Sequence, residues 1–235
     1  MDDGSRTHFR APRKSHIAAP MQMCRPLALF AAALALGLAA CAGPEADAPL
    51  ADATASPAPV TEGAWSLDPA ASRLAYVSIK AGEVAENNRF DTLSGSVAAD
   101  GTATLSIDLA SVSTGVEIRD ERMREVFFAV ADNPAATVTA KLDPARFAGL
   151  AVGQSVFRPL KAEVTVKGVS AEVETEVLVT RVAEDRVTVV PTAPVIVSTD
   201  MFGLTDELGE LRALAQLPSI TPAVPVTFTL SFKRG

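Results

Sequence analysis

The chain has 235 residues, of which 48% are apolar, and it carries a formal net charge of −7. The apolar fraction is enough for a packed core and excludes wholesale disorder, while the acidic balance argues against nucleic acid as a partner, because phosphate neutralisation needs a basic surface. The two cysteines, Cys24 and Cys41, exclude a disulfide framework and a cysteine-rich zinc fold.

The first forty residues are expected to be a signal peptide rather than part of a fold. Residues 26–40 contain no charged side chain and follow a basic residue, as in the hydrophobic region of a secretion signal, and they are too few to span a bilayer as a permanent anchor. Residues 1–20 are polar and mixed in charge, so Met21 and Met23 are alternative translation starts. Residues 1–40 are therefore excluded from the fold.

The signal ends in Leu38-Ala39-Ala40-Cys41, which resembles the lipobox of bacterial lipoproteins. The resemblance implies that Cys41 is acylated and becomes the first mature residue, and that the protein sits in the periplasm on the inner leaflet of the outer membrane, since no Asp follows the cysteine. An ordinary signal peptide that happens to contain a cysteine is the alternative. Residues 41–62 are rich in Ala and Pro without apolar periodicity, which predicts a flexible tether.

From residue 63 to residue 235, apolar and polar side chains alternate as in half-buried antiparallel strands. The pattern predicts strands over 73–80, 90–98, 104–109, 137–142, 162–167, 172–179, 186–197 and 224–232, with a three-stranded meander over 160–197. Two stretches break the alternation. Residues 117–130 are predicted to be a loop with one or two helical turns, and 205–217 a helix capped by Thr205 and ended by Pro218.

Roughly eight strands with one or two short helices predict an all-β domain, either a closed antiparallel barrel or a two-sheet sandwich. An eight-stranded barrel can enclose one small apolar ligand, whereas a sandwich has a solid core. Periodicity alone does not separate the two architectures.

Six motifs follow one another from Trp65 to Ser170. The opening WSLDP of residues 65–69, with Ser72 and Tyr76 after it, resembles the W-x-L-D-P-x-x-S-x-(I/L)-x-F start of the YceI-like family. The other five, at residues 93–97, 107–114, 119–128, 133–138 and 160–169, resemble later motifs of that family in the same order. The histidines usual in the family are absent, and 78–80 and 166–168 read SIK and VKG in their place.

The resemblance implies an all-β, lipocalin-like eight-stranded barrel that holds a long isoprenoid lipid, a quinone or a prenyl phosphate, in an internal apolar tunnel. It also implies a binding or carrier protein rather than an enzyme, with no cofactor besides the bound lipid. The alternative is a structural or stress-related envelope protein whose filled barrel binds a protein partner. The oligomeric state is open, a homodimer included.

Aromatic residues are the candidates for the wall of such a tunnel. They are Tyr76, Phe90, Phe127, Phe128, Phe228 and Phe232. Phe228 and Phe232 share one face of a regular strand, and the Tyr76 hydroxyl could reach a quinone oxygen. In a solid domain the same residues would be ordinary core.

Two arginines are the candidates for the mouth of the barrel. Arg119 and Arg122 precede an aromatic pair, and their guanidinium groups suit a polar or phosphate headgroup. The alternative is an ion-pair network, because Asp120, Glu121 and Glu125 alternate with the arginines.

Enzyme chemistry has few residues to use. No histidine follows His16, and no thiol remains free once Cys41 is acylated, so histidine-dependent nucleophiles and zinc held by nitrogen or sulfur are excluded in the mature chain. A hydrolase with paired carboxylates remains conceivable, and its candidates are Asp68, Asp91, Asp108 and Asp120. Each of these four acids is predicted at a turn or on a polar strand face, which favours an ordinary structural role over a catalytic one. No metal site is expected.

Overall fold

A computed structural model describes residues 63–235 of the chain. The predicted signal peptide, Cys41 and the tether lie outside the described residues. Twelve strands belong to one antiparallel sheet system. They are β1 Trp65–Leu67, β2 Arg73–Lys80, β3 Val84–Phe90, β4 Leu93–Val97, β5 Thr102–Asp108, β6 Val112–Ser113, β7 Ala135–Lys141, β8 Ser155–Val166, β9 Val169–Ala183, β10 Arg186–Pro191, β11 Val195–Ser198 and β12 Ala223–Arg234.

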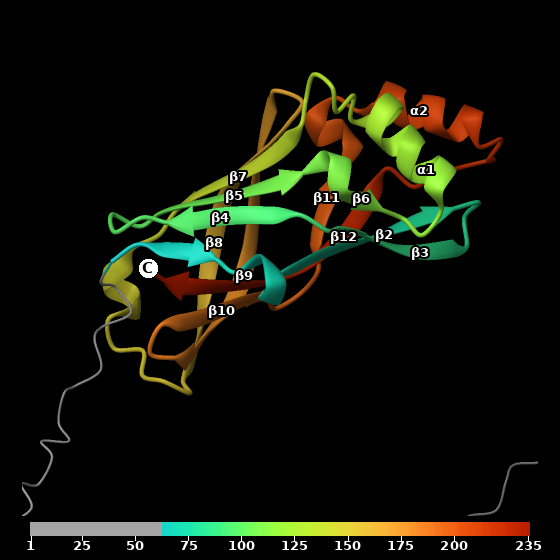
Figure 1. The fold of residues 1–235 in the computed structure, drawn as a ribbon. Helices are drawn as coiled ribbons and strands as arrows, with labels where there is room; N and C mark the ends of the chain where they lie inside the picture. Colours follow the sequence, from blue (N-terminus) through green and yellow to red (C-terminus); the bar gives the residue numbers. More distant parts are fainter. Residues whose placement is uncertain (1–62) are drawn as a thin grey trace, which may run out of the picture. The chain divides into compact units, whose positions relative to one another are not determined.

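These strands form eight continuous runs, because four runs are bent and each counts as two strands: β1 with β2, β3 with β4, β5 with β6, and β10 with β11. Every run pairs with the runs before and after it. β12 closes the circle, since it pairs with β10 and β11 on one side and with β1 and β2 on the other. The domain is therefore a closed eight-stranded antiparallel barrel (Figure 1), and closure excludes the sandwich.

Short 3-10 turns that begin at an aspartate make two of the bends. η1 (Pro69–Ala71) and η2 (Leu109–Ser111) interrupt their runs, and η4 (Pro144–Phe147) follows β7. Asp68, Asp108 and Asp143 each accept a hydrogen bond from the backbone N–H two residues on, at 3.2, 2.9 and 3.1 Å. A short carboxylate at this position satisfies a donor that the turn leaves unpaired, which is why these turns begin where they do.

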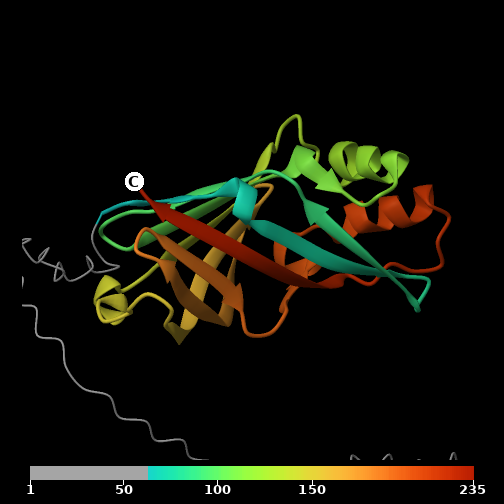
Figure 2. The same ribbon diagram turned by 60° about the horizontal axis from the view of Figure 1, so that its bottom comes forward.

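Helical segments cover one end of the barrel. α1 (Glu117–Arg122) continues into a π-helical turn, η3 (Met123–Phe127), and α2 (Thr205–Leu214) follows the 3-10 turn η5 (Thr199–Phe202). The two helices lie side by side in both views (Figure 1, Figure 2). The helical turns predicted within 117–130 are confirmed. Among the described residues, no helix is both long and apolar enough to cross a membrane.

The start of the predicted helix 205–217 agrees with the structure, in which α2 begins at Thr205, but the end of the helix and its N-cap residue differ. The helix ends at Leu214 rather than at 217, and Leu204, not Thr205, is its N-cap residue, without a side-chain cap. The different N-cap residue has its cause just upstream, where Gly203 adopts φ 68° and turns the chain from η5 directly into the helix. Thr205 is then already helical and its hydroxyl no longer faces the free N–H groups.

Two strand predictions also need correction. The polar segment 83–88 lies almost wholly within β3, although the sequence left it outside any strand. The single strand expected over 186–197 is split into β10 and β11 around Pro194, which cannot donate a ladder hydrogen bond. The other predicted strands are present, with their ends moved by up to seven residues, the largest shift being at the start of β8.

Candidate ligand-binding site

The barrel encloses a cavity of about 810 Å³, within the range that ligand pockets occupy, ~300–1,000 Å³. Each of the eight runs contributes inward apolar side chains to its wall. Representative residues, in run order, are Leu74, Phe90, Ile107, Val138, Val164, Val177, Val189 and Phe228. The helices contribute Met123 and Leu208. The interior is hollow, which is contrary to the filled barrel required by the alternative function.

All six predicted wall residues line this cavity. Phe127, Phe128 and Phe232 are also buried in the hydrophobic core, so wall and core coincide there. Ring contacts run from Tyr76 to Phe90 at 5.8 Å and from Phe90 to Phe128 at 5.9 Å between centroids, and Phe128 meets Phe127 at 4.9 Å. An aromatic row therefore leads along the wall from β2 to η3. A binding role for these residues stays a prediction.

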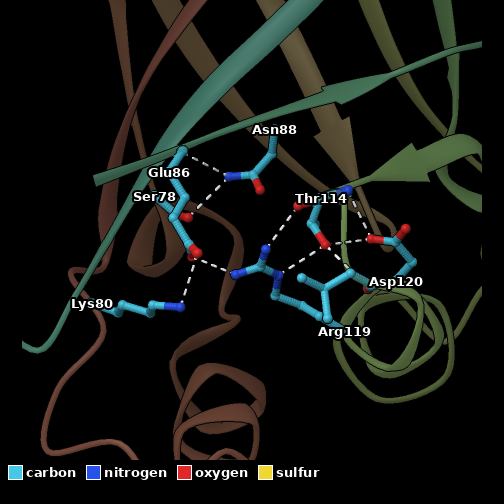
Figure 3. A network of polar contacts seen from close by, with 8 residues as sticks. Ser78, Lys80, Glu86, Asn88, Thr114, Arg119 and Asp120 are labelled. Carbon is cyan, nitrogen blue, oxygen red and sulfur yellow. Dashed lines mark hydrogen bonds and ion pairs between the residues drawn. The ribbon is translucent and has the colours of Figure 1, made fainter. Parts of the chain in front are cut away.

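A polar network lies at the helix-covered end of the cavity (Figure 3). The Arg119 guanidinium donates to the hydroxyl and the carbonyl oxygen of Thr114, at 2.8 and 2.7 Å, and also pairs with Glu86. Lys80 pairs with the other oxygen of Glu86 at 2.9 Å, and the Asp120 carboxylate accepts hydrogen bonds from Thr114. Arg119 thus ties α1 to the β2–β3 hairpin. Its ion-pair partner is Glu86 of β3, and not one of the neighbouring acids Asp120, Glu121 and Glu125 from which the sequence suggested a network.

Charge in this network also fixes the ionisation of Glu86. Burial on its own would raise the pKa of the Glu86 carboxyl, but hydrogen bonds and positive charge from Lys80 and Arg119 outweigh it and lower the pKa below its ordinary value. Glu86 is therefore ionised at neutral pH and compensates part of the positive charge.

Arg122 differs from Arg119. It lines the same cavity, but it forms no ion pair within residues 63–235. The two arginines that the sequence grouped together therefore lie at the same end of the cavity in different electrostatic states, one neutralised and one not.

Sequence reasoning missed Asn88, which lines the cavity and is only 3% exposed. Its amide nitrogen donates to the Ser78 hydroxyl at 2.9 Å and to the Glu86 carbonyl oxygen at 3.1 Å. Its side-chain oxygen has no hydrogen-bond partner in the described structure. The available signal was the polar segment 83–88, whose residues 86 and 88 are spaced by two and so share one face of a strand.

Asn88 is the direct cross-strand neighbour of Tyr76. Burial raises the pKa of the Tyr76 phenol well above its ordinary value, with the negative charge of Asp120 acting in the same direction and the positive charge of Arg119 against it. The phenol is therefore protonated at neutral pH, and no hydrogen bond joins it to another described residue.

The two segments that read SIK (78–80) and VKG (166–168) each contribute a lysine to an ion pair. Lys167, in the β8–β9 turn, donates to Glu207 of α2 at 2.7 Å and to the carbonyl oxygen of Phe127 at 3.5 Å. Lys80 pairs with Glu86, as described above. Both lysines hold the helix-covered end of the barrel together.

The far end of the cavity carries two further arginines that sequence reasoning missed. Arg146, on η4, and Arg158, on β8, both line it. Arg158 donates to the carbonyl oxygen of Arg146 at 2.8 Å and lies 5.8 Å from the centre of the Phe147 ring. Neither is in an ion pair within the described part of the chain.

None of the four candidate acids of a hydrolase lines the cavity. Asp68 pairs with Lys233 at 2.7 Å and Arg186 at 3.1 Å, and Asp91 pairs with Arg89 at 2.6 Å. Asp108 caps η2. With Asp120 bound to Thr114, all four carboxylates have structural partners, as the turn and surface interpretation predicted.

A closed antiparallel barrel around an apolar cavity, with helices over one end, defines a lipocalin-like fold. The family model described as the YceI-like domain matches residues 65–232, and the chain belongs to the YceI-like family. No curated protein matches the chain.

Two solved structures illustrate the relationship. A polyisoprenoid binding domain from Saccharophagus degradans, implicated in plant cell wall breakdown, is 38% identical, with a TM-score of 0.72 over 74% of this chain and 100% of that chain. BcnA from Burkholderia cenocepacia is 22% identical, with a TM-score of 0.55 over 70% of this chain and 98% of that chain, and it shares the fold.

Proposed function

We propose that this protein binds a long-chain isoprenoid lipid inside its barrel. The observation that carries the proposal is the cavity of about 810 Å³ with apolar side chains from every strand run. An isoprenoid tail offers only apolar surface, and transfer of such surface from water gains about 25 cal/mol per Å². A wall of this composition favours a tail over a polar metabolite.

The 38% identical relative supports the choice of ligand class, because it is described as a polyisoprenoid binding domain. The tail would lie along the inward face of β12, where Phe228 and Phe232 line the cavity. The headgroup would lie at the helix-covered end, near Tyr76, Arg119 and Arg122, where polar atoms reach the wall.

The role that fits these features is a carrier, which takes up a lipid, shields it from water and releases it unchanged. The lipobox-like sequence at Cys41 would place the carrier in the periplasm, attached to the outer membrane by acyl chains, and the tether would let the barrel reach the bilayer surface.

A matched pair of variants tests binding. Phe228→Arg puts a charged side chain into the apolar cavity, whereas Thr227→Arg puts the same side chain on the exposed outer face of the same strand. The full chain and both variants are mixed with a long-chain isoprenoid, and the complexes are identified by native mass spectrometry.

We expect the unmodified chain and Thr227→Arg to bind the lipid in a one-to-one ratio. Phe228→Arg should lose at least nine-tenths of the complex, because burying an unpaired polar group costs about 1–3 kcal/mol, a charge costs more, and about 1.4 kcal/mol is tenfold in affinity. Equal binding by the two variants would contradict a ligand inside the barrel. Circular dichroism checks that both variants are folded.

A further inference from the structure

Tyr76 and Asn88 place a hydrogen-bond donor and an acceptor on neighbouring residues of the cavity wall, and neither group has a hydrogen-bond partner within residues 63–235. They face each other across β2 and β3, and in an antiparallel pair opposite residues share one face with their Cβ atoms about 5 Å apart. Both line the cavity. The two side chains therefore belong to one small polar site beside the aromatic row.

The orientation of the Asn88 amide is fixed by its partners. A carbonyl oxygen can only accept, so the atom that contacts the Glu86 carbonyl must be the Asn88 nitrogen. The amide oxygen then points away from Glu86 and Ser78 (Figure 3). It is a buried acceptor without a donor, and buried polar atoms of this kind are rare unless something outside the protein chain satisfies them.

The Tyr76 hydroxyl supplies the complementary group. It stays protonated at neutral pH, so it can donate to a ligand oxygen. A single hydroxyl group on a ligand satisfies both residues at once, because it donates its hydrogen to one atom and accepts a hydrogen from another. A phosphate dianion has only acceptors to offer, and a quinone carbonyl or an ether would likewise leave the Asn88 oxygen unpaired.

We propose that Tyr76 and Asn88 form a headgroup site for an uncharged lipid that ends in a hydroxyl group, such as a prenol or a quinol. The ligand hydroxyl donates to the Asn88 oxygen and accepts from the Tyr76 hydroxyl. This inference rests on the proposed function, since it concerns the head of a lipid whose tail fills the barrel.

The surrounding charges fit an uncharged head. Arg119 and Lys80 both pair with Glu86, and Asp120 adds a second carboxylate through Thr114. Arg122 is the cation that this network leaves without an ion pair. A charged head would be expected at Arg122, whereas a hydroxyl is matched at Tyr76 and Asn88, and the two placements predict opposite ligand preferences.

Direct competition between lipids with different headgroups distinguishes the Arg122 placement from the Tyr76 and Asn88 placement. The full chain is mixed with a long-chain prenol, its methyl ether, its phosphate ester and the parent hydrocarbon, all with the same tail, and native mass spectrometry measures the ratio of the complexes. We expect the prenol to exceed the methyl ether by about tenfold, the ratio expected when one buried acceptor loses its donor. Asn88→Leu should abolish this preference. Asn87→Leu, on the exposed face of the same strand, should retain it.

Tyr76→Phe tests the other half of the site, because it should weaken both the prenol and the ether relative to the hydrocarbon. Equal binding of prenol and ether to the unmodified chain overturns the proposal, as does a preference for the phosphate ester, and neither result depends on a variant folding. If the hydrocarbon and the other lipids all fail to bind, the proposed function itself fails. If all four bind equally, the function stands and the headgroup site does not.

Discussion

At the scale of single residues, the barrel wall does not tolerate an added side chain where the backbones of two strands approach closely. Gly95 on β4 lies opposite Leu105 of β5, and a Cβ atom at Gly95 would come within 2.5 Å of the Thr104 carbonyl oxygen. Backbone atoms on both sides cannot move independently, so Gly95→Ala should destabilise the domain by about 1–3 kcal/mol, as overpacking does. Urea unfolding of the full chain measures the loss.

Gly149→Ala is the control for this prediction, because a Cβ atom there has no neighbour within 4 Å. Its effect should stay within about 0.5 kcal/mol of zero. Equal stability of the two variants would contradict the close contact between the backbones of β4 and β5 at Gly95.

The placement of a side chain on the cavity face could be predicted where apolar and polar residues alternate along a strand, and could not be predicted where a residue breaks that alternation. Phe228 and Phe232 could be placed on the cavity side because β12 alternates without exception. Asn88 could not, since a polar side chain turned inward contradicts the alternation on which strand prediction depends. Polar residues at inward-facing strand positions are expected at functional sites. The polar segment 83–88 is therefore a signal of the site that can be recognised once the fold is known.

At the scale of elements, ion pairs with carboxylates hold the helices to the barrel, and pH should loosen them. Lys167 lowers the pKa of Glu207 by donating a hydrogen bond, although burial opposes it, and Lys80 and Arg119 lower the pKa of Glu86 against its burial. The folded state therefore binds fewer protons at these groups than the unfolded state. Their contribution is complete above the unfolded pKa of about 4.3 and is lost as pH falls through the lower folded pKa.

We expect amide protection in α1 and α2 to fall as the pH drops below about 4.3, the unfolded pKa of a glutamate, while protection in β9 changes much less. Hydrogen exchange with mass spectrometry measures both in one experiment. Glu86→Gln removes the titrating group, so its α1 protection should be lower at neutral pH and should change less with pH. Helix protection that follows β9 through the whole range would contradict this account.

The order of the strands and helices could be predicted from the sequence, but the bends and helix boundaries that connect them could not. Period-2 alternation identified most strands, and the family motifs identified the barrel. The bends at η1 and η2 depend on a carboxylate that contacts the backbone two residues on, which the strand pattern does not register. Likewise the way the chain enters α2 depends on the φ angle of Gly203 rather than on the spacing of the leucines.

At the scale of the whole molecule, a hollow barrel should be more stable when its cavity is filled. Binding to the folded state alone adds RT ln(1 + [L]/Kd), which is about 2.7 kcal/mol when free ligand is 100 times Kd. For a domain of this size, that corresponds to a rise in Tm on the order of 5–10 °C. Thermal unfolding with and without a long-chain isoprenoid measures the shift, and Phe228→Arg should show almost none. An unchanged Tm for the unmodified chain at saturating lipid would contradict a ligand held in the cavity.

The central claim is that the cavity of this protein holds an isoprenoid lipid in the cell. The most direct test is to purify the full chain from cells that produce it, weigh it by native mass spectrometry, and identify the lipids released by organic solvent. We predict a one-to-one complex whose excess mass is that of an isoprenoid with a hydroxyl head, recovered in the extract. Protein that carries only detergent or phospholipid, with no isoprenoid in the extract and none taken up on addition, would contradict the claim.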